Sequence, residues 1–89
     1  MYQELYTVKD QKAETFYPPF VQTNENVAIR TFSQLINDPK HPFGKNPEDY
    51  VLFKVGTYDD IDMKIDLLEA LRPIVRGDEI PTWEPQTEE

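Results

Sequence analysis

The sequence predicts a small α+β fold, a β-α-β-β chain in which one amphipathic helix covers one face of a small antiparallel or mixed sheet. Two observations support this prediction. Apolar residues recur at helical spacing between residues 28 and 36, and alternating, β-like segments lie before and after them, at residues 1–10, 50–58 and 63–68. We expect residues 1–76 to form a single globular domain and residues 77–89 to form an acidic, proline-containing, flexible tail.

The first strand is predicted over residues 1–10, with Tyr6 and Val8 as its inward pair. The connection that follows contains Pro18 and Pro19, which lack a backbone donor and hold the chain extended. Three aromatic side chains flank these prolines, and exposing so much apolar area would be costly. We expect them to cover an edge of the core: Phe16, Tyr17 and Phe20.

A helix is predicted to begin after Thr23 or Asn24, because either side chain can cap the first turn. It is expected to end before Pro39, since the residue preceding a proline is disfavoured in the α region. We expect its apolar stripe to face the core rather than a partner. The stripe consists of Ala28, Ile29, Phe32, Leu35 and Ile36.

The central strand is predicted over residues 50–58, the longest β-like run of the chain, after a loop at residues 39–49. Because side chains alternate along a strand, this run has two faces. We expect the helix to cover the face with Val51, Phe53, Val55 and Thr57. The face expected to stay open carries Tyr50, Leu52, Lys54, Gly56 and Tyr58, extended by Thr7, Lys9, Lys64, Asp66 and Leu68 of the neighbouring strands.

Residues 63–68 also alternate, which favours a strand paired with the central one. The alternative is a short helix over residues 65–71 that ends at Pro73, because Glu69, Ala70 and Leu71 are good helix formers. We favour the strand, since the central strand would otherwise lack a neighbour. Residues 72–80 are expected to return to the body in an extended conformation.

The composition limits the class of protein. With 89 residues, 38% hydrophobic content and a mean hydropathy of -0.67, the chain suits one globular body of modest stability. No run approaches the roughly 20 apolar residues that cross a bilayer, and the N-terminus lacks a signal-peptide pattern. The chain has no cysteine, which agrees with a reducing compartment. We therefore expect a cytosolic protein without a membrane partner.

Arrangements of residues that suit catalysis or metal binding are nearly absent from the sequence. His41 has no companion histidine and no adjacent serine or threonine, so it fits neither a metal site nor a nucleophile-base pair. Asp60 and Asp62 begin like a calcium loop, but Lys64 stands where an oxygen ligand is required. The three glycines are isolated, which excludes a phosphate-cradling loop. We expect a protein that is not an enzyme and needs no metal or cofactor.

The charge is unevenly distributed. Nine basic and twelve acidic residues give residues 1–76 a net charge of -3, and five acidic residues give residues 77–89 a charge of -5. The total of -8 opposes nucleic-acid binding, but most of the excess lies in the tail. The tail is expected to compete with nucleic acid for basic residues, to recruit a partner protein or to keep the chain soluble. Trp83 is expected either to dock on a neighbouring subunit or to belong to a short linear motif for a separate partner.

Single-stranded nucleic acid binds to lysines or arginines near its phosphates and to aromatic rings on which its bases stack. The open face supplies both kinds of side chain, and the candidates on it are Lys9, Tyr50, Lys54, Tyr58 and Lys64. A second basic strip is possible at Arg30, Lys40 and Lys45. The tyrosines could instead fill a subunit interface. We expect a homodimer or a higher homo-oligomer, because a three-stranded sheet with one bare face would be weakly stable.

Several motifs of the chain occur together in one known family. They are DQKAETFYPPF from Asp10 to Phe20, AIRxF from Ala28 to Phe32, ND at Asn37, and PEDYxLFxxGxYD from Pro47 to Asp59. In this order, and over roughly residues 8–76, the chain resembles the small nonstructural protein of gokushoviruses. These are Microviridae, phages with circular single-stranded DNA genomes.

The resemblance implies a non-enzymatic DNA-binding phage protein that acts in genome replication or in the switch to single-strand synthesis and packaging. It also implies a location in the host bacterial cytoplasm and a role outside the virion structure, and it makes a host or phage replication protein the expected partner of the acidic tail. Lys12 and Arg30 are the matched basic residues and become further DNA-contact candidates. Other matched positions are expected to shape the central strand and its turn: Pro47, Asp49, Gly56 and Asp59.

Two hypotheses follow from the sequence. The leading one is an oligomeric single-stranded-DNA-binding protein without strong sequence preference. The alternative is a protein-protein adaptor that acts on the host replication machinery or on the capsid precursor and does not contact DNA.

Overall fold

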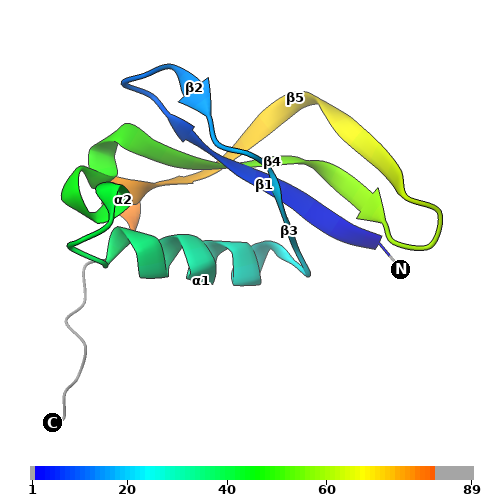
Figure 1. The fold of residues 1–89 in the computed structure, drawn as a ribbon, viewed down its shortest axis with the longest axis horizontal. Helices are drawn as coiled ribbons and strands as arrows, with labels where there is room; N and C mark the ends of the chain where they lie inside the picture. The colour runs from blue at the N-terminus through cyan, green and yellow to red at the C-terminus, as the bar shows by residue number, and fades with distance from the viewer. Residues whose placement is uncertain (1, 82–89) are drawn as a thin grey trace, which may run out of the picture.

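One antiparallel sheet and one main helix make up residues 2–81, the part of the chain that this computed structural model describes. The strands are β1 (Tyr2–Asp10), β2 (Thr15–Phe16), β3 (Phe20–Gln22), β4 (Tyr50–Asp59) and β5 (Lys64–Arg76), and the helix is α1 (Glu25–Ile36). The strand order is β2-β1-β4-β5, with β3 also paired to β1. Figure 1 shows α1 along one side of the sheet and the β4–β5 hairpin extending beyond it. The predicted α+β class is confirmed.

The outer edge of β1 is paired in two pieces. Lys9 pairs with Phe16 of β2, and Tyr6 pairs with Phe20 of β3. Between these pieces lie Pro18 and Pro19, which cannot donate to a ladder and therefore interrupt the strand. The break is bridged by the Thr7 hydroxyl, which donates to the Tyr17 carbonyl at 2.6 Å. The aromatic connection is therefore an ordered edge of the sheet.

Helix α1 begins and ends where the sequence predicts. Asn24 is the N-cap, with an extended backbone, and its side chain accepts a hydrogen bond from the Val27 amide at 3.0 Å. The helix ends at Ile36, before Asn37 and the proline that follows. Its predicted stripe packs on the sheet, and the core cluster comprises Tyr6, Val8, Ala28, Phe32, Ile36, Phe43, Tyr50, Leu52 and Ile80.

The segment predicted as a loop at residues 39–49 contains two short helices, α2 (Pro42–Lys45) and η1 (Pro47–Asp49). His41 caps α2, because its Nδ1 accepts a hydrogen bond from the Phe43 amide at 3.1 Å. The Phe43 side chain is buried and its ring lies 4.4 Å from that of Tyr50, measured between centroids. This segment therefore closes one end of the core, and η1 leads directly into β4 as Pro47 and Asp49 were expected to do.

The β4–β5 hairpin confirms the predicted strand at residues 64–68, places Met63 in the turn before it, and excludes the short helix over residues 65–71. Asp59 holds the turn, since its carboxylate accepts from the Ile61 amide and its carbonyl accepts from the Met63 amide, both at 2.9 Å. Gly56 allows β5 to approach closely: a Cβ there would lie 2.1 Å from the Asp66 carbonyl oxygen. The roles expected of Gly56 and Asp59 are confirmed.

The packed body continues past Arg76, where the tail was predicted to begin. Residues 77–79 form a short 3-10 helix, η2 (Gly77–Glu79), and Ile80 is buried in the same cluster as Ile36. The extension follows from packing, because Ile80 covers the end of the core near the C-terminus of α1. The predictions for Trp83 and for the rest of residues 82–89 lie outside the described residues.

The prediction of which sheet face meets the helix is wrong. Residues opposite one another in a ladder share a face, and Tyr50, Leu52 and Lys54 pair with Asp10, Val8 and Tyr6, on the side that α1 covers. Strand alternation groups side chains correctly but does not say which group turns inward. Here both groups contain apolar residues, and the side chains on the Tyr50 face are the ones that pack with α1 and Phe43 in the core.

A β-bulge at Val55 is a second reason why the predicted open face does not exist. Tyr6 pairs with Lys54 but Leu5 pairs with Gly56, so Val55 is an extra residue on β4. The bulge moves every later side chain of β4 to the other face. Tyr58 therefore lies on the face away from α1, opposite to the face that carries Lys54.

Candidate nucleic-acid interface

Tyr50, a predicted stacking residue, is part of the core. Its side chain is only 8% exposed, and its ring contacts those of Phe43 and Tyr17 at centroid distances of 4.4 and 6.4 Å. Burial raises the pKa of the Tyr50 hydroxyl above its ordinary value, with Asp10 adding to the effect. A ring in this position stabilises the fold and leaves no free surface on which a base could stack.

Lys54, a predicted phosphate ligand, is already paired. Its Nζ lies 3.5 Å from Oε2 of Glu4, and its side chain is 18% exposed. Glu4 also accepts a hydrogen bond from the Tyr6 hydroxyl. Burial, together with this bond, raises the pKa of Tyr6. The three side chains form a polar network inside the monomer, in which the ammonium of Lys54 is paired with the carboxylate of Glu4.

The remaining predicted residues are scattered. Arg30 is exposed on the outer side of α1, and Lys64 is exposed at the start of β5, far along the hairpin. Tyr58 is half-buried on the sheet face away from α1, opposite Gln3 in the ladder. The seven predicted residues therefore do not form one surface. Lys9 lies on β1, and Lys12 lies in the turn that follows it.

Lys9 lies next to an exposed aromatic ring that the sequence did not single out for stacking. The Lys9 ammonium is 5.4 Å from the centroid of the Phe16 ring, and Phe16 is 47% exposed. Behind Phe16, the Phe53 ring packs edge-on at 5.8 Å. The β1–β2 register, Lys9 opposite Phe16, creates this arrangement. We call Lys9, Phe16 and Phe53, together with Lys12 of the adjoining turn, the hairpin cluster.

The turn that carries Lys12 is held by its own backbone bonds. The Asp10 carboxylate accepts from the amides of Lys12 and Ala13, both at 3.1 Å. Glu14, the last residue of this turn before β2, adopts a positive φ of 58°. Because the Asp10 carboxylate is directed at backbone amides, it does not pair with Lys9, whose ammonium lies beside the exposed Phe16 ring, and Lys12 follows in the same turn. This is the combination that single-stranded nucleic acid requires.

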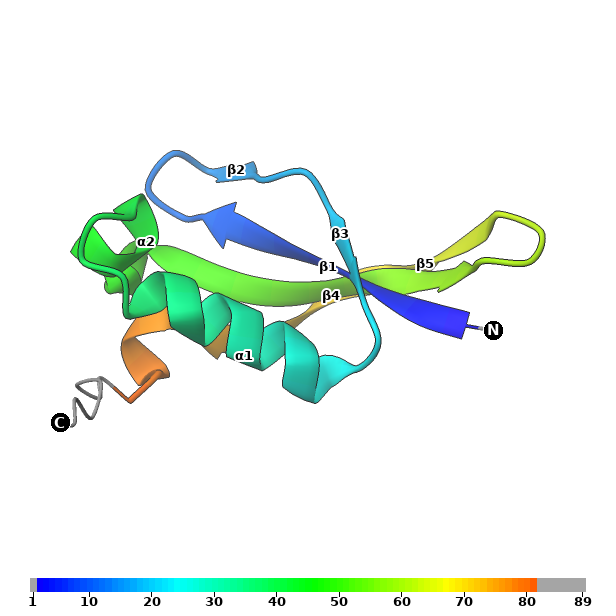
Figure 2. The ribbon, with the colours of Figure 1, turned by 60° about the horizontal axis from the view of Figure 1, so that its bottom comes forward.

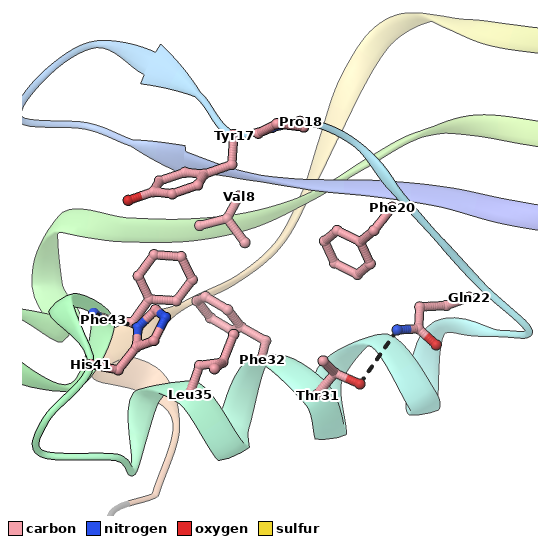
Figure 3. A pocket seen from close by; sticks show the side chains of 10 residues that line it. All are labelled: Val8, Tyr17, Pro18, Phe20, Gln22, Thr31, Phe32, Leu35, His41 and Phe43. Carbon is pink, nitrogen blue, oxygen red and sulfur yellow. Dashed lines mark hydrogen bonds between the residues drawn. The ribbon is translucent and has the colours of Figure 1, made fainter.

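A cavity of about 410 Å³ opens on the other side of the sheet, between α1 and the β2–β3 segment. Figure 3 shows the rings of Tyr17, Phe20, Phe32 and Phe43 around it. Gln22 Nε2 donates to Thr31 Oγ1 at 3.4 Å near its rim. No lysine or arginine lines this cavity, so it is suited to an apolar or aromatic group rather than to a phosphate.

Across residues 2–81, none of the helices combines the length and the apolar character needed to span a bilayer. Within the same range, His, Asp and Glu side chains do not gather into a group of three that could hold a metal ion. Neither observation assigns a function by itself.

Comparison with known proteins adds the family. A family model described as "Phage ORF5 protein" matches residues 3–80, from β1 to the buried Ile80. Among curated proteins, no match was found. Among solved structures, none matched either. Because the matched range covers the whole packed body, with its sheet, its helix and the hairpin cluster, the chain belongs to the Phage ORF5 protein family.

Proposed function

We propose that this phage protein binds single-stranded DNA, without catalysis and without strong sequence preference. It does so in the host cytoplasm during genome replication or the switch to single-strand synthesis and packaging. One observation supports the proposal above others: the Lys9 ammonium lies 5.4 Å from the exposed ring of Phe16. The Lys9–Phe16 pair presents a stacking surface and a cation at the same place.

The chemistry of the hairpin cluster accounts for the expected lack of sequence preference. Every base has a flat face that can stack on Phe16, and stacking contributes roughly 1 to 3 kcal/mol per base. Lys9 and Lys12 attract phosphates, which are the same in every sequence. The net charge of -8 opposes this attraction, so binding should be modest and strongest at low salt.

A fluorescence-anisotropy titration with a labelled oligothymidine, at two salt concentrations, tests the proposal. We expect binding that weakens as salt increases, because phosphate contacts release counterions. Phe16→Ala should weaken binding by roughly 5- to 150-fold, the equivalent of one lost stack. Phe16→Tyr keeps a ring and should bind nearly as well as the unmodified protein.

Val21→Ala is the matched control, since Val21 is another exposed apolar residue on the β2–β3 edge and lies outside the hairpin cluster. It should leave binding unchanged. The proposal is wrong if Phe16→Ala binds as tightly as Val21→Ala. A chain ending at Pro81 lacks three glutamates of residues 82–89 and should bind more tightly at low salt.

A second candidate function is a protein-protein adaptor that acts on the host replication machinery or on the capsid precursor. The observation in its favour is the row of exposed apolar side chains on the β4–β5 hairpin, such as Ile61, Met63 and Leu67. Such a surface is typical of a protein contact rather than a DNA contact. Absence of oligothymidine binding at low salt, even for the chain ending at Pro81, would favour the adaptor.

A further inference from the structure

The far end of the β4–β5 hairpin exposes apolar side chains on a strand that has a free edge. Residues 60–73, which we call the hairpin arm, are all exposed. Figure 2 shows the arm extending past the start of α1, beyond the cover of the helix. Its large apolar side chains are between 36% and 81% exposed, and they are Ile61, Met63, Ile65, Leu67, Leu68 and Leu71.

The free edge belongs to β5. This strand is last in the order β2-β1-β4-β5, so its outer edge has no partner strand among residues 2–81. An edge of 13 residues offers a row of backbone donors and acceptors for another strand. Pro73 interrupts the row near its end. Residues 68–71 also form an irregular stretch of β5, since Gly56 pairs with Leu67 whereas Lys54 pairs with Arg72. A long apolar edge of this kind is a ready template for pairing with a second chain.

We propose that the second chain is another copy of this protein, and that two β5 strands pair antiparallel about a two-fold axis. The axis stands perpendicular to the sheet and joins two sheets into one. Identical edges satisfy one another without any further partner, as closed two-fold dimers require. Pairing of the two β5 strands would satisfy both free edges and bring the exposed apolar side chains of the two hairpin arms into contact. The dimer does not rest on the proposed DNA binding.

The charges on β5 limit the register of this pairing. With a perpendicular axis, residues opposite one another come from the same face, so the register is centred on a residue. Centring on Asp66 or on Glu69 would place identical carboxylates opposite each other. Centring on Leu68 would place Lys64 opposite Arg72 of the second copy. Each of these registers is disfavoured, because like charges directly opposite destabilise a ladder.

Centring on Leu67 avoids every such clash over residues 64–70. Lys64 then lies opposite Ala70 of the second copy, and Ile65 lies opposite its Glu69. Leu67, which is 68% exposed in the monomer, lies opposite its own counterpart and is buried by it. The register centred on Leu67 therefore avoids like-charge pairs and covers an apolar side chain at its centre.

The size of the contact fits a dimer that dissociates on dilution. A standard stable interface takes about 20 to 30 residues from each partner, and the arm contributes residues 60–73. A perpendicular axis also keeps each face on its own side, so both hairpin clusters would lie on the face away from α1. One strand of DNA could then contact two clusters, with the gain in affinity that linked sites provide.

Sedimentation over a range of protein concentrations, without DNA, tests the dimer. We expect a monomer-dimer equilibrium that Leu67→Asp shifts at least tenfold toward monomer, because two carboxylates would meet at the axis. Gln34→Asp, on an exposed position of α1, is the matched control and should dimerise normally. Circular dichroism must show both variants folded. A wild-type chain that stays monomeric at all concentrations overturns the proposal, whatever the outcome of the DNA titration.

The register can be tested separately, because the chain contains no cysteine. Leu67→Cys introduces one thiol per copy, and a short bifunctional thiol reagent should link two copies rapidly, since opposite Cβ atoms lie about 5 Å apart. Gln34→Cys carries its thiol on α1 and should be linked only by slow random collision. Equal rates for the two variants would contradict the proposed register.

Discussion

Lys54 Nζ lies 3.5 Å from Glu4 Oε2, on the sheet face that α1 covers. The same glutamate accepts a hydrogen bond from the Tyr6 hydroxyl. One carboxylate therefore contacts Tyr6 on β1 and Lys54 on the neighbouring strand β4. Lys54 was predicted from the sequence as a DNA contact, but its ion pair with Glu4 joins β1 to β4. This relationship changes what mutation of Lys54 should do.

Lys54→Met should reduce the stability of the fold more than it reduces DNA binding. The change removes the cation that balances Glu4, and the expected loss is about 1 kcal/mol, since both side chains keep some contact with solvent. Urea denaturation measures it. In a double-mutant cycle with Glu4→Gln, the two losses should not add. Additive losses would show that the two side chains act independently.

Stability should fall as the pH rises above about 10, the ordinary pKa of tyrosine. Burial raises the pKa of Tyr50 in the folded state, so between the two pKa values the unfolded chain holds fewer protons than the folded one. Stability is therefore complete below the unfolded pKa and is lost as the pH rises toward the folded one. Denaturation at a series of pH values from 9 to 11 measures the slope.

Tyr50→Phe should reduce this alkaline slope, and Tyr6→Phe should reduce it further because burial and Glu4 raise the pKa of Tyr6 as well. Tyr2→Phe is the control, since Tyr2 is exposed at the start of β1. A slope that is the same in Tyr50→Phe as in Tyr2→Phe would contradict the assignment of Tyr50 to the core.

Gly56→Ala should destabilise the pairing of β4 with β5. The added Cβ would lie 2.1 Å from the Asp66 carbonyl oxygen, so the backbone of β5 would have to move away. We expect a loss of about 2 kcal/mol or more, in the range of overpacked sites. Hydrogen exchange should locate the loss in the hairpin arm. Thr57→Ala, at the next position of β4, should cost much less.

Met63→Gly should stabilise the β4–β5 turn. Met63 has a φ of 64°, in the left-handed region that costs a residue with a side chain roughly 1 kcal/mol and costs glycine little. Thermal denaturation should show a small increase in midpoint. Met63→Ala removes the same apolar side chain but keeps the backbone cost, so it should not stabilise. If both variants behave alike, the turn conformation is not the source of the effect.

Much of the secondary structure could be predicted from local sequence signals. Asn24 and Pro39 delimit α1, and Asp59 marks the turn between the strands, because caps, prolines and turn residues act on the backbone next to them. Lys9 and Lys12 could also be named as basic candidates from the sequence. These features need no knowledge of which segments meet in space.

The candidate site could be predicted only in part. Phe16 was expected to cover the core edge, and its role beside Lys9 depends on the β1–β2 register. Tyr50 and Lys54 were expected on an open face, and the cluster around Phe43 and the network around Glu4 hold them in the monomer. No local pattern contains these partners, because they come from other segments of the chain.

The sequence by itself determined the helix α1 and the order of the strands β1, β4 and β5, because caps, turns and alternation depend on neighbours within a few residues. The short strands β2 and β3 and the short helices α2, η1 and η2 appear only in the tertiary structure. The tertiary structure decided which face of β4 is buried, since both faces carry apolar side chains and the choice depends on how α1 and Phe43 pack. It also decided that Tyr58 and Lys54 point to opposite sides, because the Val55 bulge arises only when β1 and β4 pair.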